Sequence, residues 1–307
     1  MTKPHQLSQE TIQKIEALLN EDLSSRKIAD LLEISKSTVN NYRPQLNLSK
    51  NKQKLNITFL DIETAPDVAV TFKRFKANIN QDSVLKDGGW LLSIAYKEGN
   101  SQIKSFSLTP EEAISANDSR LCAILFDIIE KSDILCGHNL DNFDLPVIKS
   151  RLLINGFPAI KKVRTIDTLK IARQMKFQSN KLDSLTRILT RDNKIENGGI
   201  SLWVDCIHGN ADALKKMEKY NAKDVEIQEK LYEVVKSYNK TPLNLGLNFD
   251  DNLPRCPYCS SAAVKETGQN IFTNTSVFSE IICMSCGARS RSKQSKISTE
   301  KRKNLLC

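Results

Sequence analysis

The spacing of apolar residues changes along the chain, and each spacing predicts a type of secondary structure. Between residues 8 and 20, apolar side chains recur at helical spacing, and Ser8 is a suitable N-cap. Residues 57–63 form an apolar, β-branched run, which predicts a strand. Later runs predict strands at 90–96, 102–108, 134–136 and 163–166, and helices at 110–128, 142–154, 168–176, 181–190 and 211–238. Because strands come first and then alternate with helices, we expect an α/β fold with a mixed sheet flanked by helices.

Residues 24–43 predict two short helices separated by a three-residue turn. Ala29 is a small residue where the helices would approach, Ile34 would fill the turn, and Glu33 stands where glycine is usual. This pattern resembles a helix-turn-helix, which would span residues 1–48. The resemblance implies that polar residues of the second helix face a DNA groove: Lys36, Ser37, Thr38, Asn40, Asn41 and Arg43. Three of them are candidate substrate-binding residues: Lys36, Asn40 and Arg43. A helical dimerisation or docking module is the alternative.

The net charge of +9 is unevenly distributed along the 307 residues. Residues 1–54 carry a net +3, residues 55–251 are neutral, and residues 252–307 carry a net +6. A neutral core with basic ends suggests attachments that bind a polyanion, DNA in preference to RNA. Ordinary solubilising charge is the alternative.

The sequence has no run long enough to span a membrane and no apolar signal peptide at its start, so we expect a cytosolic protein without a membrane partner. If a phage encodes it, the compartment would be the host cytoplasm.

Four of the eight cysteines form two Cys-x-x-Cys pairs, and this spacing predicts a structural zinc site. The four candidate ligands are Cys256, Cys259, Cys283 and Cys286. Gly287 suits a tight turn after the second pair, and residues 271–282 alternate like a hairpin. This region, residues 252–290, resembles a zinc ribbon. It has few large apolar side chains, so its folding should depend on the metal.

The remaining segments are linkers and a tail. Residues 49–55 are expected to form a polar linker that precedes the main domain at 56–242. Residues 291–307 are basic and rich in serine, which predicts disorder and phosphate binding without sequence preference. Such binding should weaken steeply with salt.

Carboxylates follow the predicted strands at several points. Asp61 and Glu63 lie two apart on one strand, so they point to the same face. Like charges this close raise each other's pKa unless a cation lies between them, and Mg²⁺ or Mn²⁺ is the natural cation for a carboxylate pair. Asp144 follows a later strand, and Tyr220 and Asp224 share a helix face. An edge strand with two solvated acids is the alternative for the first pair.

These residues, in this order, resemble the three motifs of the DEDD exonucleases, which have a ribonuclease H-like fold. The motifs are Asp61-x-Glu63, Asn139-xxx-Phe143-Asp144 and Tyr220-xxx-Asp224. The tyrosine marks the DEDDy subgroup, which includes the proofreading domains of family B DNA polymerases and compact phage and bacterial exonucleases. The resemblance covers residues 55–240 and includes the stretch from Leu202 to Tyr232.

The resemblance implies a role for each motif residue. Two metal ions, Mg²⁺ or Mn²⁺, about 3.5–4 Å apart would clamp the attacking and leaving oxygens of the phosphodiester. Asp61 would bridge both ions, Glu63 and Asp224 would complete the nucleophile-side site, and Asp144 would hold the second ion. Tyr220 would orient the attacking water without ionising.

Other residues near the motifs have less distinctive roles. Asn139 would contact substrate or brace Asp144. His138 is interpreted as structural, and Phe143 as a packing residue in preference to a wedge against the substrate end. Asp167 is interpreted as an N-cap, and Trp203 as part of the core of a lid region.

Together these features predict a metal-dependent 3′–5′ exonuclease acting on single-stranded DNA, with release of nucleoside 5′-monophosphates. Partners would include nucleic acid and a replication or repair complex. An RNA-trimming nuclease with the same site is one alternative, because the sequence does not show whether the site accepts or excludes the 2′-hydroxyl of RNA. A non-catalytic DNA-binding regulator is the other, although all four acids and the tyrosine are present.

Overall fold

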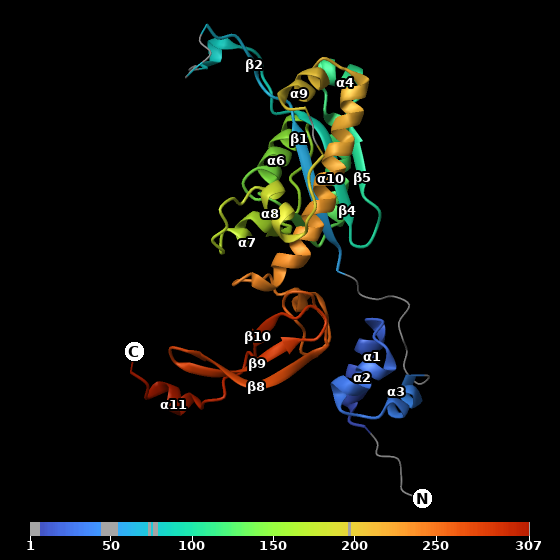
Figure 1. Ribbon diagram of the computed structural model, residues 1–307, viewed down its shortest axis with the longest axis vertical. Helices are drawn as coiled ribbons and strands as arrows, with labels where there is room; N and C mark the ends of the chain where they lie inside the picture. Colours follow the sequence, from blue (N-terminus) through green and yellow to red (C-terminus); the bar gives the residue numbers. More distant parts are fainter. Residues whose placement is uncertain (1–6, 44–54, 73–74, 76–78, 196–197, 307) are drawn as a thin grey trace, which may run out of the picture. The chain divides into compact units, whose positions relative to one another are not determined.

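The computed structural model describes residues 7–43, 55–72, 75, 79–195 and 198–306. The chain divides into two compact units (Figure 1). One unit is Leu55–Val235, and the other combines Met1–Lys54 with Lys236–Cys307. Most of the expected linker at 49–55 lies outside the described residues. No helix among the described residues is long and apolar enough to cross a membrane.

A mixed five-stranded sheet is the centre of the Leu55–Val235 unit, with strand order β5-β4-β1-β6-β7. β1 lies in the middle, antiparallel to β4 and parallel to β6, and β7 extends the parallel part. The strands are β1 (Ile57–Thr64), β4 (Leu91–Glu98), β5 (Lys104–Ser107), β6 (Ile134–Gly137) and β7 (Arg164–Asp167). Burial on both faces explains why β1, β4 and β6 appear in the sequence as nearly continuous apolar runs.

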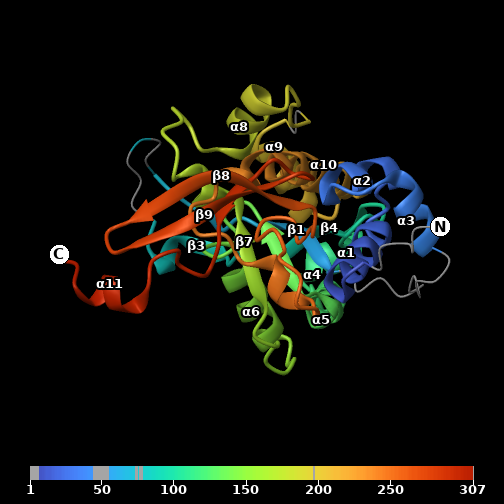
Figure 2. The ribbon, with the colours of Figure 1, turned by 90° about the horizontal axis from the view of Figure 1, so that it is seen from below.

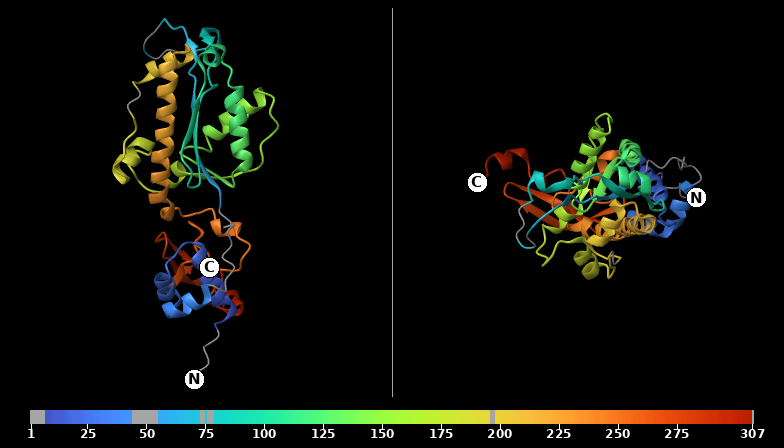
Figure 3. Two further views of the ribbon diagram at one scale, coloured as in Figure 1. Left: turned by 90° about the vertical axis from the view of Figure 1, so that its right-hand side faces the viewer. Right: turned by 90° about the horizontal axis from the view of Figure 1, so that it is seen from above.

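Helices cover both faces of this sheet, as Figures 2 and 3 show. The long helix α10 (Ala211–Val235) packs across β4, β1 and β5 on one face. α5 (Ser119–Lys131) and α6 (Asp144–Ile154) cover the other face. One apolar core joins the sheet to both helical layers. The predicted mixed α/β architecture is therefore confirmed.

Shorter elements complete this unit. They are β2 (Val68–Ala69), η2 (Gln81–Ser83), β3 (Val84–Lys86), α4 (Pro110–Ser115), α7 (Thr168–Ala172), α8 (Leu182–Leu189) and α9 (Ile200–Ile207). Helix α4 begins with a capping box, in which the side chains of Thr109 and Glu112 accept hydrogen bonds from each other's backbone N–H groups. Helix α9 follows a polar stretch and begins at Ile200.

A buried ion pair ties α5, α6 and the start of β4 together. The guanidinium of Arg151 donates two hydrogen bonds, of 2.7 and 2.8 Å, to the fully buried carboxylate of Asp118. The same carboxylate accepts from the Leu91 backbone N–H and from the Asn155 amide, each at 2.9 Å. Burial alone would raise the pKa of Asp118, but these bonds and the charge of Arg151 lower it. This ion pair therefore depends on an ionised Asp118.

The N-terminal helices are α1 (Gln9–Asn20), α2 (Ser25–Leu32) and α3 (Lys36–Tyr42), each capped by a serine. Glu33, at the turn between α2 and α3, adopts the left-handed conformation with φ 55° and ψ 38°. The Ile34 N–H bonds back to the Ala29 carbonyl at 3.1 Å and so closes the end of α2. Glycine would adopt this conformation at lower cost. The turn therefore keeps its backbone geometry although it lacks the usual residue.

The C-terminal segment forms a three-stranded ribbon of order β10-β9-β8. Its elements, with the short helices around them, are η3 (Lys236–Tyr238), η4 (Leu245–Asn248), β8 (Val264–Thr273), β9 (Ser276–Cys283), β10 (Arg289–Arg291) and α11 (Thr299–Lys303). The segment at 291–307 was expected to be disordered, and its first residues hydrogen-bond to β9. The Ser292 N–H bonds to the Ser279 carbonyl at 2.9 Å, and the Lys296 N–H bonds to the Val277 carbonyl at 2.7 Å. Composition does not reveal these two contacts because they are backbone hydrogen bonds.

The helix-turn-helix and the ribbon share one small core. Ala262 and Ala263 of the ribbon are buried among apolar residues of all three N-terminal helices. The Glu21 carboxylate accepts from the Ala262 backbone N–H at 2.8 Å and from the Ser261 hydroxyl at 2.5 Å. It also pairs with Arg255 at 3.4 Å. Two modules that the sequence suggested as separate therefore form one body.

Candidate functional site

The carboxylates of three residues meet at one point of the Leu55–Val235 unit. Asp61 and Glu63 lie on β1 opposite Ala95 and Ser93 of β4. Pairing with β4 therefore fixes the backbone of β1 at both acids. Asp224 reaches them from α10. Ligand oxygens of the three acids all lie within 4.8 Å of one another. The structure thus brings together residues from the first and third predicted motifs.

Asp144, from the second motif, lies beside this group in the first turn of α6. Its Oδ1 accepts from the backbone N–H of Ile62, between Asp61 and Glu63, at 3.3 Å. The side chain is buried, and its negative charge contributes to raising the pKa of Asp61. Asp144 is therefore close to the cluster, although it is not one of the three acids with oxygens within 4.8 Å.

Tyr220 and Asp224 share the buried face of α10, as their spacing predicted. Lys194, from the segment that precedes α9, contacts both residues. Its Nζ lies 2.5 Å from Asp224 Oδ2 and 3.2 Å from the Tyr220 hydroxyl oxygen. The ammonium also lies 5.2 Å from the centre of the Tyr220 ring. One positive charge is therefore built into a strongly acidic site.

The electrostatics of the site favour neutral acids when no metal is bound. Burial, together with the neighbouring carboxylates, raises the pKa of Asp61 well above its usual range. Burial likewise raises the pKa of Glu63 to about 7 and that of Asp144 to about 7. The pKa of Asp224 is also raised by burial, against the opposing influence of Lys194. The pKa of Lys194 is raised because the charge of Asp224 outweighs the effect of burial.

Three residues of the site had no motif that identified them in the sequence. Lys194 lies in a polar stretch with no local pattern. The Asn221 amide donates to Asp61 Oδ2 at 3.3 Å, and its position next to Tyr220 was the only available signal. Trp203, on α9, packs edge-to-face against Tyr220 with ring centres 6.1 Å apart. Trp203 is partly buried against the main core of the unit.

The loop after β6 is held by Asp167 at the end of β7. Asp167 caps α7 through the N–H groups of residues 169 and 170, as predicted, and its Oδ1 also accepts from the Asn139 N–H at 3.0 Å. Asn139 has a left-handed backbone, with φ 73°. Within the described parts of the chain, its side-chain amide makes no hydrogen bond, so Asn139 does not brace Asp144 through one.

His138 and Phe143 differ in how well they match their predicted roles. Both ring nitrogens of His138 are hydrogen-bonded at 2.9 Å, one to the Thr168 hydroxyl and one to the Asn180 carbonyl, which agrees with a structural role. Burial lowers the pKa of this histidine. The packing role of Phe143 is not supported, because its side chain is 43% exposed. Phe143 is the N-cap residue of α6, at the junction between the loop and the helix.

The carboxylate cluster suits a hard divalent cation. Its donors are all oxygens, which is the preference of Mg²⁺ and Mn²⁺. Oδ1 of Asp224 is buried and has no hydrogen-bond partner among the described residues. A buried carboxylate oxygen without a partner is costly, and a bound cation would satisfy it. The residues therefore fit the metal that the sequence predicted.

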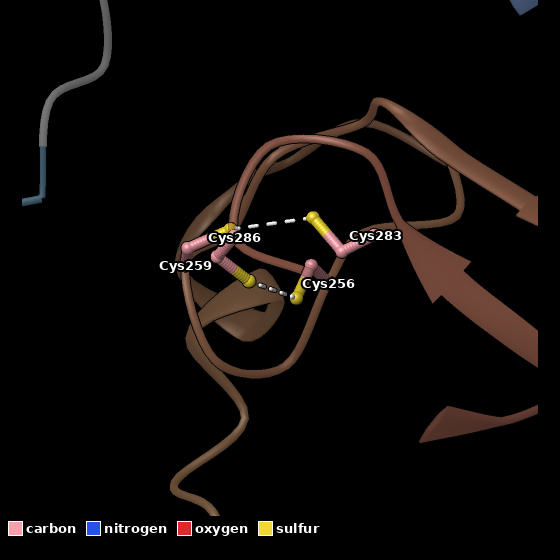
Figure 4. Close-up of side chains that lie close together, drawn as sticks. All are labelled: Cys256, Cys259, Cys283 and Cys286. Atoms are coloured by element: carbon pink, nitrogen blue, oxygen red, sulfur yellow. Dashed lines mark hydrogen bonds between the residues drawn. The ribbon is translucent and has the colours of Figure 1, made fainter. Parts of the chain in front are cut away.

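The four cysteines of the ribbon converge in the same way, as Figure 4 shows. Their sulfurs lie within 4.8 Å of one another, with Cys256 Sγ 3.7 Å from Cys286 Sγ and Cys259 Sγ 3.6 Å from Cys283 Sγ. Gly287 has the expected positive φ, 71°, and its N–H bonds to the Cys283 carbonyl at 2.9 Å. Four thiols at this spacing are compatible with tetrahedral zinc.

The predicted DNA-facing residues lie on the exposed side of α3. Lys36, Asn40 and Arg43 are all exposed, whereas Val39 between them is fully buried in the core shared with the ribbon. All three belong to the unit that does not contain the carboxylates.

Comparison with known proteins agrees with this architecture. A family model described as the RNase_H superfamily matches residues 83–236, half of the chain, and a helix-turn-helix domain model matches residues 3–41. The chain belongs to the RNase_H superfamily. This membership indicates a nucleic acid hydrolase, and the helix-turn-helix adds a second indication of nucleic acid binding.

Among solved structures, one similar chain is the family B DNA polymerase from the hyperthermophilic archaeon Pyrobaculum calidifontis. The two chains are 14% identical, with a TM-score of 0.42, and the match covers 68% of this chain and 27% of the polymerase. The chain thus matches about a quarter of that protein's length. A comparison with curated proteins found no match.

Proposed function

We propose that this protein is a metal-dependent 3′–5′ exonuclease that cuts single-stranded DNA and releases nucleoside 5′-monophosphates. The observation that carries the proposal is the convergence of Asp61, Glu63 and Asp224, with Asp144 beside them, from three separate elements. The 3′ direction and the mononucleotide product rest on the resemblance of the motifs to DEDDy exonucleases. The helix-turn-helix favours DNA as the polymer and a setting in replication or repair.

The four acids would hold two divalent metal ions. Such ions supply Lewis-acid stabilisation of the phosphate and lower the pKa of a water molecule. The protein's part is to present ionised carboxylates in a fixed arrangement. Asn221 holds Asp61 through its amide, and the Ile62 N–H holds Asp144. Both contacts restrict carboxylates that would otherwise rotate.

Tyr220 would position the attacking water. Burial raises the pKa of its hydroxyl, so the group stays protonated and able to donate at neutral pH. Trp203 packs against one side of the ring, and Lys194 contacts the hydroxyl at 3.2 Å. The exposed ring of Phe143 next to Asp144 offers an apolar surface for the terminal base of a strand.

The test is a time course on 5′-labelled single-stranded DNA and RNA of matched sequence, with Mg²⁺, with Mn²⁺ or without added divalent metal. We expect a ladder that shortens by one nucleotide at a time on DNA and needs the metal. Asp224→Ala should abolish cleavage while leaving the affinity for DNA unchanged. Asp141→Ala is the matched control, because this acid lies in the loop after β6 but pairs with Lys170 at 2.7 Å outside the cluster.

Other outcomes distinguish the alternatives. A ladder on RNA alone would keep the site but assign it to RNA trimming. Internal cuts would refute the exonuclease mode. If the wild type and Asp61→Ala were equally inert on every substrate, the protein would be a DNA-binding regulator. A loss of DNA affinity in Asp224→Ala as large as its loss of cleavage would contradict the assignment of Asp224 to catalysis.

A further inference from the structure

A groove in the ribbon has no role in the chemistry described so far. Its cavity volume is about 610 Å³, and its walls come from the first cysteine pair, β9, β10, the segment that follows β10, and α11. Tyr258 and Phe278 contribute aromatic rings, and Arg291, Lys293 and Arg302 contribute positive charges. The volume is within the range of about 300–1,000 Å³ that is typical of small-molecule sites.

The three cations of the groove are exposed and have no acidic partner within the described parts of the chain. None of the described residues that line the groove is acidic. Glu280 lies on β9 opposite Arg291, but its carboxylate is paired with Arg289 at 2.7 Å. Three like charges at one groove repel one another, and an anionic ligand would relieve that repulsion.

Two of these cations are held in place by the fold. The Arg291 guanidinium lies 3.9 Å from the centre of the Phe278 ring, and this stacking orients it while its N–H groups stay accessible. Lys293 follows Ser292, whose backbone N–H and hydroxyl are both hydrogen-bonded to Ser279. Because these side chains start from fixed backbone, less entropy is lost when they bind a ligand.

We propose that this groove binds single-stranded nucleic acid, with the three cations on successive phosphates and the aromatic ring of Tyr258 against a base. A positively charged groove with flat aromatic walls is the general solution for single strands without sequence preference. The groove is a binding site of its own and goes beyond the proposed hydrolysis, on which it does not depend.

The test uses the full chain, loaded with zinc and carrying Asp61→Asn so that cleavage does not interfere. Binding of a fluorescein-labelled oligothymidylate is followed by anisotropy over a range of salt concentrations. The groove variant combines Arg291→Gln, Lys293→Gln and Arg302→Gln. The matched control changes the same charge in the same segment, through Lys296→Gln, Lys301→Gln and Lys303→Gln, none of which lines the groove. Equal zinc content and circular dichroism establish that both variants are folded.

Each phosphate contact with a single strand contributes about 0.7 to the slope of log affinity against log salt. The groove variant should therefore lose about 2 from that slope and about 100-fold in affinity near 0.1 M salt, whereas the control should lose less than about fivefold. A strand containing 4-thiothymidine should photo-crosslink to the peptide with Tyr258 or to residues 289–303 in the control but not in the groove variant.

Equal losses in the two variants, or crosslinks only elsewhere, would overturn the proposal. Competition by duplex DNA or polyglutamate as effective as that by single strand would also overturn it, since the groove would then be a general polyanion or acidic-peptide site. If the wild type cuts no substrate but the groove variant still loses affinity, the nuclease proposal fails and this inference stands.

Discussion

Replacing Lys194 with methionine removes the positive charge from the acidic cluster while keeping most of the side-chain volume. We expect Lys194→Met to bind Mn²⁺ more tightly than the wild type when no nucleic acid is present. A divalent cation on these carboxylates must either displace the ammonium from Asp224 or share that carboxylate with it. Both arrangements weaken the interaction between Lys194 and Asp224. The variant lacks that interaction, so its metal binding does not include this cost in free energy.

The magnitude follows from the geometry of the ion pair. Lys194 Nζ lies 2.5 Å from Asp224 Oδ2, and the two side chains are 26% and 4% exposed. A hydrogen bond to a charged group in such a setting contributes about 1.5–3 kcal/mol. Since about 1.4 kcal/mol corresponds to a factor of ten, the variant should bind Mn²⁺ about 10- to 100-fold more tightly.

Protons compete with the metal, and this sets the conditions of the assay. Lys194 acts to lower the pKa of Asp61, Glu63 and Asp224, so its removal makes these acids easier to protonate. The titration is therefore carried out well above pH 7 on zinc-loaded protein, with the electron paramagnetic resonance signal of free Mn²⁺ as the readout. Lys170→Met removes a surface ion pair of the same unit and should leave Mn²⁺ affinity unchanged.

Equal or weaker Mn²⁺ binding by Lys194→Met at high pH would refute the reasoning. It would mean that the ammonium does not oppose the metal and that its contact with Asp224 is lost at no cost. A change of the same size in the Mn²⁺ affinity of Lys170→Met would also refute it, because the effect would then come from the net charge of the protein and not from the contact of Lys194 with Asp224.

Four further predictions concern stability, pH and the second unit. Asp118→Asn should destabilise the Leu55–Val235 unit by about 3 kcal/mol, because it leaves Arg151 without its carboxylate partner. Both tryptophans lie in this unit, so tryptophan fluorescence during urea unfolding measures its free energy of unfolding. Mn²⁺ affinity should rise from pH 6 to pH 8, since the pKa values of Glu63 and Asp144, about 7, mean that protons must leave before metal binds; a flat profile would contradict those pKa values. The raised pKa values of these two acids also mean that the folded state favours their protonated forms. The free energy of unfolding of the metal-free protein should therefore fall as the pH rises through about 7. Glu21→Ala should loosen the N-terminal helices from the ribbon at a cost of about 2 kcal/mol, seen as faster hydrogen exchange in residues 9–20 without a change in tryptophan fluorescence.

Much of this protein was predictable from sequence because the relevant signals are local. A strand alternates with a period of two, so Asp61 and Glu63 had to share a face wherever β1 lay in the fold. The two Cys-x-x-Cys pairs and the capping box of α4 are likewise short patterns whose geometry depends on a few neighbouring residues. These patterns determined the fold class and the candidate ligands.

Only the tertiary structure decided which distant residues join them. Lys194 is 30 positions from Asp224, and Asn221 is 160 positions from Asp61, so no periodicity relates either pair. The contact between Glu21 and Ala262 spans 241 positions. The groove in the ribbon depends equally on backbone hydrogen bonds that hold a basic, serine-rich segment against β9. Side chains that satisfy buried charges are chosen by proximity in space, and that proximity is a property of the packed chain, not of its local sequence.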